Sequence, residues 1–288
     1  MSRSKNLPEH RRVRPLLGTL VEVVVPAGPR SAEMMERAFS VITRVQTLMS
    51  AHDVSSDLGR LHAASPGQPV ALHPWTWRVL AAAERMRQRT RGIFDVIAAG
   101  AAAEERGDLP PWSKPAPPAG RPPARLKLLS RHRASLSGPA RIDLGGIAKG
   151  FAVDQAVRAL KRAGLPWGLV NAGGDLRGFG PRTWTIHLRH PAAPGQLLPR
   201  EICNCAVATS APYFSKTMQD GRLTSALFDA RSLRFITEPI SATVFAPTCL
   251  VADALTKTIL AGGESTVLND YRARALLLVT SEKEHDAA

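Results

Sequence analysis

The chain has 288 residues, enough for one large domain or two small ones at roughly 100–200 residues per domain. Apolar residues make up 44% and charged residues 22%, which is typical of globular proteins and excludes global disorder. No apolar stretch approaches the roughly 18–20 residues of a membrane-spanning helix. The N-terminal segment lacks the apolar run of a signal peptide. We therefore expect a cytoplasmic protein with no membrane span.

The balance of 38 basic against 24 acidic residues gives a formal charge of +14. Such a charge favours polyanionic partners, among them nucleic acids and the phosphates of a dinucleotide. Aromatic residues are only 5% of the chain, and no nucleic-acid-binding module can be recognised. A basic nucleic-acid-binding protein is therefore a hypothesis that we keep only as an alternative, and we expect no nucleic acid partner.

Residues 1–13 form a basic segment that we interpret as an N-terminal arm. The β-branched segment Thr19–Val25 predicts a strand, and apolar residues at three- and four-residue spacing predict a helix from Ser31 to Met49. A second helix is expected after Pro74. Residues 110–123 contain seven prolines, which exclude a helix or central strand and indicate a long exposed loop.

The second half of the chain mixes strands with few helices. A helix is expected up to Gly164, another at Leu250–Leu260, and residues 281–288 form a polar tail. Strands are expected at Ala140–Leu144, Gly168–Ala172, Thr183–Leu188, Ile202–Ala208, Ser241–Ala246 and Ala275–Thr280. This order favours an α+β fold, with residues 14–280 as a single unit.

Three cysteines are too few, and odd in number, for a disulfide framework. Cys203 and Cys205 can form half of a metal site, but no second Cys or His pair stands at zinc spacing. We therefore interpret all three as core cysteines.

The segment Asp143–Gly150 joins a strand end to a helix start through two adjacent glycines. The free N–H groups and the positive dipole end of such a helix suit a phosphate group, and Lys149 can add a charge. The pattern matches neither the P-loop nor the dinucleotide Gly-x-Gly-x-x-Gly motif. A plain strand-to-helix turn is the alternative interpretation.

Two further positions carry acids. Asn171-Ala-Gly-Gly-Asp175 stands at a strand end, either as a ligand site or as a glycine turn capped by its own carboxylate. Asp253 lies one turn into an apolar helix and needs a partner there. That partner can be a metal ion, Lys257 at i+4, or a backbone cap.

Taken together, these segments resemble the FAD:protein FMN transferases, the ApbE-type flavinyltransferases. Ile142-Asp-Leu-Gly-Gly-Ile-Ala-Lys-Gly-Phe-Ala-Val-Asp154 is similar to the family's I-D-L-G-G-I-A-K-G-Y-A-V-D, and Leu169–Asp175 resembles its L-V-N-A-G-G-D. Shorter matches run in family order from about residue 14 to residue 263: Leu17–Thr19, Ser56–Leu58, Gly92–Asp95, Ala208–Ser210 and Ala252–Leu255.

The resemblance implies an α+β, T-fold-related architecture of mixed sheets with packed helices. It also implies a magnesium-dependent enzyme that cleaves FAD, attaches FMN through a phosphoester to a Thr or Ser of an acceptor redox protein, and releases AMP. Such acceptors carry an Asp-Gly-Ala-Thr/Ser-like motif. The implied metal ligands are the main-chain oxygen of Ala148 and the carboxylate of Asp253. The implied ligand-binding residues are Leu17, Phe94, Asp95, Asp143, Lys149, Asp154, Asn171, Gly173, Gly174 and Asp229; no general base is assigned.

The chain departs from the family pattern beside the transferred phosphate. Lys257 stands where the family has a metal-ligating threonine, and Ala226 replaces a histidine. Leu17 replaces a methionine. Two hypotheses follow: an active enzyme that holds a weakly bound magnesium ion through Asp253, Ala148 and waters, or a catalytically impaired FAD-binding homologue in which Lys257 partners Asp253. The family's lipobox cysteine is also lacking, which favours a cytoplasmic location.

Overall fold

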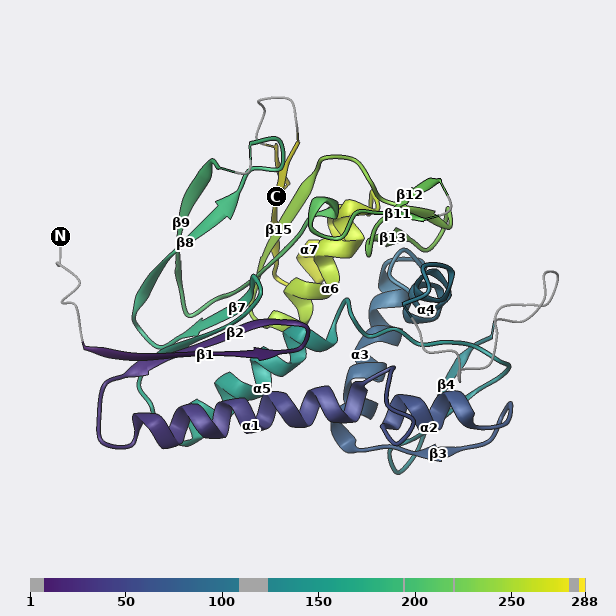
Figure 1. Cartoon of the computed structure of the whole chain (residues 1–288), viewed down its shortest axis with the longest axis horizontal. Coiled ribbons are helices and arrows are strands. Elements are labelled where there is room, and N and C mark those ends of the chain that lie inside the picture. Colours follow the sequence, from purple (N-terminus) through teal and green to yellow (C-terminus); the bar gives the residue numbers. More distant parts are fainter. Residues whose placement is uncertain (1–7, 109–123, 194, 220, 280–284, 288) are drawn as a thin grey trace.

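The computed structural model describes residues 8–108, 124–193, 195–219, 221–279 and 285–287, so the expected proline-rich loop at 110–123 lies outside the described residues. The centre of the fold is an eight-stranded sheet, antiparallel throughout, in the order β1-β2-β6-β7-β10-β15-β16-β17 (Figure 1). Its strands are β1 (Glu9–Leu16), β2 (Thr19–Pro26), β6 (Gly168–Ala172), β7 (Asp175–Phe179), β10 (Ala206–Ser210), β15 (Ser241–Ala246), β16 (Arg274–Leu278) and β17 (His285–Ala287).

Three helices cover one face of this sheet: α1 (Ser31–Met49), α5 (Ala148–Arg162) and α6 (Cys249–Leu260). Helix α1 packs along α5, and α5 packs against α6 (Figure 1). The expected spacing in α1 is confirmed, because its buried face includes Met35, Ala38, Phe39 and Ile42. Burial of these apolar faces against the sheet forms the main core.

A hairpin of β8 (Thr183–Arg189) and β9 (Leu197–Cys203) packs on the opposite face of the sheet. Strand β8 alternates exposed and buried residues along its whole length, as its sequence predicts for a strand with one wet face. Trp184, Ile186 and Leu188 point inward and form a second apolar cluster with Leu169 and Leu176 of the large sheet.

The remaining elements form the walls around the candidate site. Helices α2 (Asp57–Ala63), α3 (Pro74–Arg89) and α4 (Val96–Glu105) accompany a small sheet of β3 (Val70–Ala71), β5 (Arg133–Leu136) and β4 (Leu126–Leu129). A short helix η1 (Pro212–Phe214) precedes two hairpins, β11 (Thr217–Gln219) with β12 (Arg222–Thr224) and β13 (Phe228–Asp229) with β14 (Arg234–Phe235). Helix α7 (Thr266–Asp270) precedes β16. Figure 1 shows α4 facing the hairpins.

The α+β class is confirmed, but several boundaries differ from expectation. Residues 9–13 belong to β1 and not to an arm, because β1 pairs with β2 along its full length. The expected strand Ile202–Ala208 is two strands, separated where Asn204 adopts a left-handed φ of 46°. The segment Ala140–Leu144 is not a strand, and the expected polar tail contains β17.

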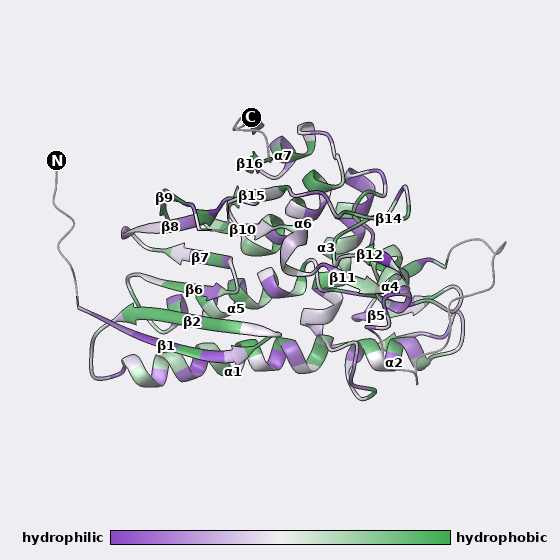
Figure 2. Cartoon of the chain, turned by 45° about the horizontal axis from the view of Figure 1, so that its top comes forward, coloured by the Kyte–Doolittle hydropathy of each residue, from purple (hydrophilic) through white to green (hydrophobic). Residues whose placement is uncertain are grey.

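The arginines of β1 are neutralised locally. Arg11 pairs with Glu22 at 2.7 Å, and Arg12 and Arg14 both reach Glu36 on α1. Figure 2 shows β1 as hydrophilic beside a largely hydrophobic β2. Among the described residues, no helix is long and apolar enough to cross a membrane.

Candidate anion site

The glycine turn between Asp143 and Ala148 is fixed by hydrogen bonds at both ends. The Asp143 carboxylate accepts the Gly145 N–H at 2.7 Å, and the Asp143 N–H donates to the Val96 carbonyl at 2.9 Å. Burial raises the pKa of Asp143. At its other end the turn leads directly into α5, where the Ala148 N–H donates to the Leu144 carbonyl at 2.8 Å.

A buried histidine of α2 holds the segment that enters this turn. The Ile142 N–H donates to Nε2 of His62 at 2.9 Å. Burial, reinforced by the charge of Arg141, lowers the pKa of His62 to about 4 from its ordinary value of 6.5. A protonated imidazole carries a hydrogen on both nitrogens and cannot accept this bond.

We expect stability to fall as the pH is lowered from about 6.5 to about 4. The unfolded histidine binds a proton in this window and the folded one does not, so acid favours unfolding by up to about 3 kcal/mol. Urea unfolding as a function of pH measures this. His62→Gln keeps an acceptor but does not titrate, and it should remove this part of the pH dependence; His187→Gln, on the exposed face of β8, should leave it intact. An unchanged profile in His62→Gln would contradict the assignment.

A pocket of about 270 Å³ opens where the glycine turn, α4, α6 and the segment that leads into the β13–β14 hairpin meet. Phe94, Asp95, Asp143 and Lys149, four of the residues expected to bind the nucleotide, line it. Further lining residues are Arg106, Gly145, Gly146, Ser210, Ser215, Ala226, Phe228 and Lys257. Ala226 therefore presents only a methyl group at this wall.

A second pocket of about 700 Å³ shares Asp95, Val96 and Ala230 with the first. Asp95 lines both pockets. Its carboxylate caps α4 by accepting the Ile97 N–H at 2.8 Å and the Ala98 N–H at 3.2 Å. Small-molecule sites typically enclose roughly 300–1,000 Å³. The two adjoining pockets together reach the size that an extended ligand needs.

Two buried acids and two lysines form a charged cluster: the lysines line the pocket, and the acids lie behind them. Lys149 pairs with Asp175 at 3.0 Å, and Lys257 contacts the Asp253 carboxylate one helical turn away. The Gly150 N–H donates to the second oxygen of Asp253 at 3.0 Å. Thus the glycine turn and Asp253 converge, as the sequence predicts.

The ammonium groups control the ionisation of Asp253. Its burial alone would raise the pKa, but the charges of Lys257 and Lys149 outweigh that effect and lower the pKa below its ordinary value. The negative charge of Asp253 raises the pKa of Lys149, and that of Asp175 adds to the effect, although the burial of the lysine acts in the opposite direction. Asp253 and Lys149 are therefore charged at neutral pH.

The residues present do not fit a magnesium ion. A hard divalent ion needs several oxygen ligands, whereas both oxygens of Asp253 already accept hydrogen bonds from Lys257 and Gly150. In the described part of the chain, no group of three or more His, Cys, Asp or Glu side chains can hold a metal ion. At the expected ligand pair, Ala148 and Asp253, the ammonium group of Lys257 therefore lies where the metal ion would bind.

Asp154 has a structural role in the described chain. Its carboxylate accepts the Cys249 and Leu250 N–H groups at the start of α6, both at 3.0 Å, and pairs with Arg177. It is 5% exposed and is not among the described residues that line either pocket. Its expected place beside the nucleotide stays a prediction.

The other expected ligand residues occupy turns around the site. Asn171 accepts the Gly174 N–H at 2.9 Å within the β6–β7 turn, where Gly173 and Gly174 both have positive φ. In the described structure these three do not line the two pockets. Asp229 caps its own hairpin by accepting the Arg231 N–H at 2.9 Å.

Leu17 lies in the β1–β2 turn with a φ of 56°, and its N–H donates to the Gln46 side chain at 2.6 Å. It lines a separate open depression formed by this turn and Gln46. The β1–β2 turn packs closely on the β6–β7 turn, because a Cβ added to Gly173 would lie 2.3 Å from Oγ1 of Thr19.

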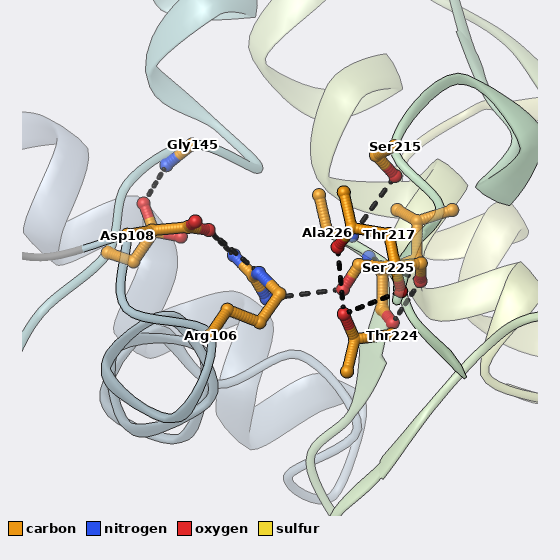
Figure 3. Close-up of polar contacts among 10 residues, drawn as sticks. Arg106, Asp108, Gly145, Ser215, Thr217, Thr224, Ser225 and Ala226 are labelled. Carbon is orange, nitrogen blue, oxygen red and sulfur yellow. Dashed lines mark hydrogen bonds and ion pairs between the residues drawn. The ribbon is translucent and has the colours of Figure 1, made fainter. Parts of the chain in front are cut away.

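Sequence reasoning missed Arg106, which spans the two walls of the pocket. It follows α4, donates to Oδ2 of Asp108 at 2.7 Å, and reaches across to the Ser225 carbonyl at 3.2 Å. Figure 3 shows it between Gly145 of the glycine turn and the strand end that carries Ser225. Nothing in the sequence distinguishes it from the other arginines.

The cysteines also differ from expectation. Cys249 is buried, as a core residue should be, but Cys205 is only partly buried and Cys203 is exposed. Within the described residues neither contributes to a group that can hold a metal ion. The interpretation as core cysteines therefore holds for Cys249 alone.

The fold and the pocket define the class: an α+β protein with a candidate anion site at a glycine-rich helix start. The model of the ApbE family matches residues 17–276. The chain belongs to the ApbE family.

Relatives and solved structures agree with this membership. The FAD:protein FMN transferase of Treponema pallidum (strain Nichols) is 27% identical over 86% of this chain and 77% of its own length. That of Vibrio cholerae is 26% identical over 87% and 80%. In fold, the flavin transferase ApbE from Vibrio cholerae has a TM-score of 0.82 at 24% identity, covering 97% of both chains. The ApbE protein of Thermotoga maritima has a TM-score of 0.84 at 23% identity with the same coverage.

Proposed function

We propose that this chain is an FAD:protein FMN transferase. It binds FAD, cleaves the diphosphate, attaches FMN through a phosphoester to a Thr or Ser of an acceptor redox protein, and releases AMP. The acceptor residue lies in an Asp-Gly-Ala-Thr/Ser-like motif. Support comes from the names of its relatives and above all from one observation: the Asp143–Gly150 turn and the charged face of α6 meet at one pocket.

In this reaction the acceptor hydroxyl oxygen attacks the phosphorus of the FMN half. The new P–O bond forms as the bond to the bridging oxygen breaks, and that oxygen leaves with AMP while the hydroxyl proton is released. Negative charge shifts onto the leaving phosphate. Lys149 and Lys257 line the pocket, and their positive charges would stabilise it there.

FAD binding without transfer is the second candidate. The observation that favours it is the wall beside the pocket, where Ala226 offers no group that can hold or accept a proton. Ser210, which also lines the pocket, does not supply such a group, because its hydroxyl is hydrogen-bonded to Thr256 at 2.8 Å and the residue is 9% exposed.

Incubation with FAD and a small acceptor domain carrying the motif tests the proposal. We expect intact-mass spectrometry to show an FMN-sized adduct on the acceptor, together with stoichiometric AMP. An acceptor whose hydroxyl residue is replaced by valine is the matched control and should gain no mass. FAD binding without an adduct would support the second candidate, whereas absence of both binding and adduct would contradict both.

A further inference from the structure

We propose that Lys257, assisted by Lys149, is the resident cation of the pocket. Its ammonium group takes the place on Asp253 that a divalent metal ion would need, and the ligand diphosphate is bound by ammonium groups of the chain without a metal. This inference rests on the proposed function for the identity of the ligand, FAD. It concerns how that ligand is held.

The first argument is the state of Asp253. The carboxylate is 0% exposed, and each of its oxygens already has a donor, Lys257 at one and the Gly150 N–H at the other. A divalent ion bound there must displace the ammonium group from a fully buried carboxylate. It must then also remain close to Lys149, whose charge repels it.

The second argument is the number of donors left for a ligand. An ammonium group has three N–H donors. Lys257 directs one donor to Asp253, so two of its donors remain. Lys149 directs one donor to Asp175 and a second to the Gly145 carbonyl at 3.3 Å, so one of its donors remains. Both side chains line the pocket. Three charged donors therefore remain for phosphate oxygens, on the side away from the buried acids.

The third argument is the position of the Lys257 chain. A Cβ added at Gly146 would lie 3.4 Å from Cε of Lys257 and 3.6 Å from Cε2 of Phe94. The lysine therefore passes directly beside the glycine turn, in contact distance of the backbone that a phosphate would approach.

The test compares FAD binding with and without a divalent ion. Quenching of flavin fluorescence is titrated in EDTA and in excess Mg²⁺. We expect one and the same Kd for the wild-type chain under both conditions. Lys257→Thr frees an oxygen of Asp253 and supplies a hydroxyl ligand, so its affinity in EDTA should fall about 10- to 100-fold, the equivalent of one charged hydrogen bond. Mg²⁺ should restore it.

A second readout does not depend on FAD. Mn²⁺, followed by electron paramagnetic resonance, should stay free in solution with the wild-type chain and bind to Lys257→Thr. The double variant Asp253→Asn/Lys257→Met has neither charge, and its FAD affinity should be low in both buffers. Lys161→Met, an exposed lysine in the last turn of α5, is the matched control and should behave as wild type.

The outcomes separate the two proposals. Wild-type FAD binding that requires Mg²⁺, or Mn²⁺ bound by the wild-type chain, overturns the resident cation and leaves the proposed transferase standing. Failure to bind FAD in either buffer overturns the proposed function, whatever the Mn²⁺ result. Equal binding in both buffers, with a Mg²⁺ requirement gained in Lys257→Thr, supports the inference.

Discussion

Replacing Lys257 by methionine should lower the free energy of unfolding by about 3–5 kcal/mol, the cost of leaving a buried charge without its partner. Asp253 is 0% exposed and Lys257 is 18% exposed, so water cannot replace the lost ammonium group at the carboxylate. Lys149 forms its ion pair with Asp175, so its charge acts on Asp253 but does not take the place of the lost contact. Urea unfolding at neutral pH measures the loss.

The double variant Asp253→Asn/Lys257→Met distinguishes a lost charge partner from lost packing. It removes the buried carboxylate as well, so most of the stability should return even though the lysine is still missing. An equal loss in the single and double variants would mean that the methylene chain of Lys257, and not its charge, stabilises the helix pair. An unchanged single variant would contradict the ion pair itself.

Gly150→Ala should destabilise the chain by about 3 kcal/mol or more, at the upper end of the range for overpacked sites. The added Cβ would lie 2.2 Å from the Cys249 carbonyl oxygen and 2.6 Å from its carbon, both backbone atoms. Helices α5 and α6 would have to separate, which stretches the Gly150 N–H bond to Asp253. Thermal unfolding should show a Tm lower by roughly 5 °C.

Gly28→Ala is the matched control. No described atom lies within 4 Å of a Cβ added there, and its φ is not positive. We expect its Tm to equal that of the wild type. A Gly150→Ala variant as stable as this control would show that the two helices tolerate a wider spacing, against the close approach described here.

The sequence predicted best those helices and strands that the spacing of neighbouring apolar residues determines. The helix of residues 31–49 follows from apolar spacing, because a 3.6-residue period specifies both the element and its buried face. Strand β1 was missed for the same reason. At the edge of the sheet most of its residues are exposed, so Glu9–Leu16 shows no alternation of apolar residues by which a strand is recognised.

The candidate site was predicted as far as its motifs are continuous in the chain. The glycine turn was recognised, and its meeting with Asp253 is confirmed. The sequence did not decide whether Asp253 is paired with a metal ion, with Lys257 or with a backbone cap, because the answer depends on which groups the fold brings near the carboxylate. The role of Asp154 depends on an α6 terminus 95 residues further along the chain, which local patterns do not reveal.

Helices α5 and α6 are joined by side-chain bonds at two levels, from Asp154 to the start of α6 and from Gly150 to Asp253. Each helix carries one of the two pocket lysines. Their ammonium groups are consequently preorganised at a fixed separation before any ligand arrives. Binding then has little conformational entropy to remove from the receptor, and a greater share of the electrostatic attraction is retained as affinity.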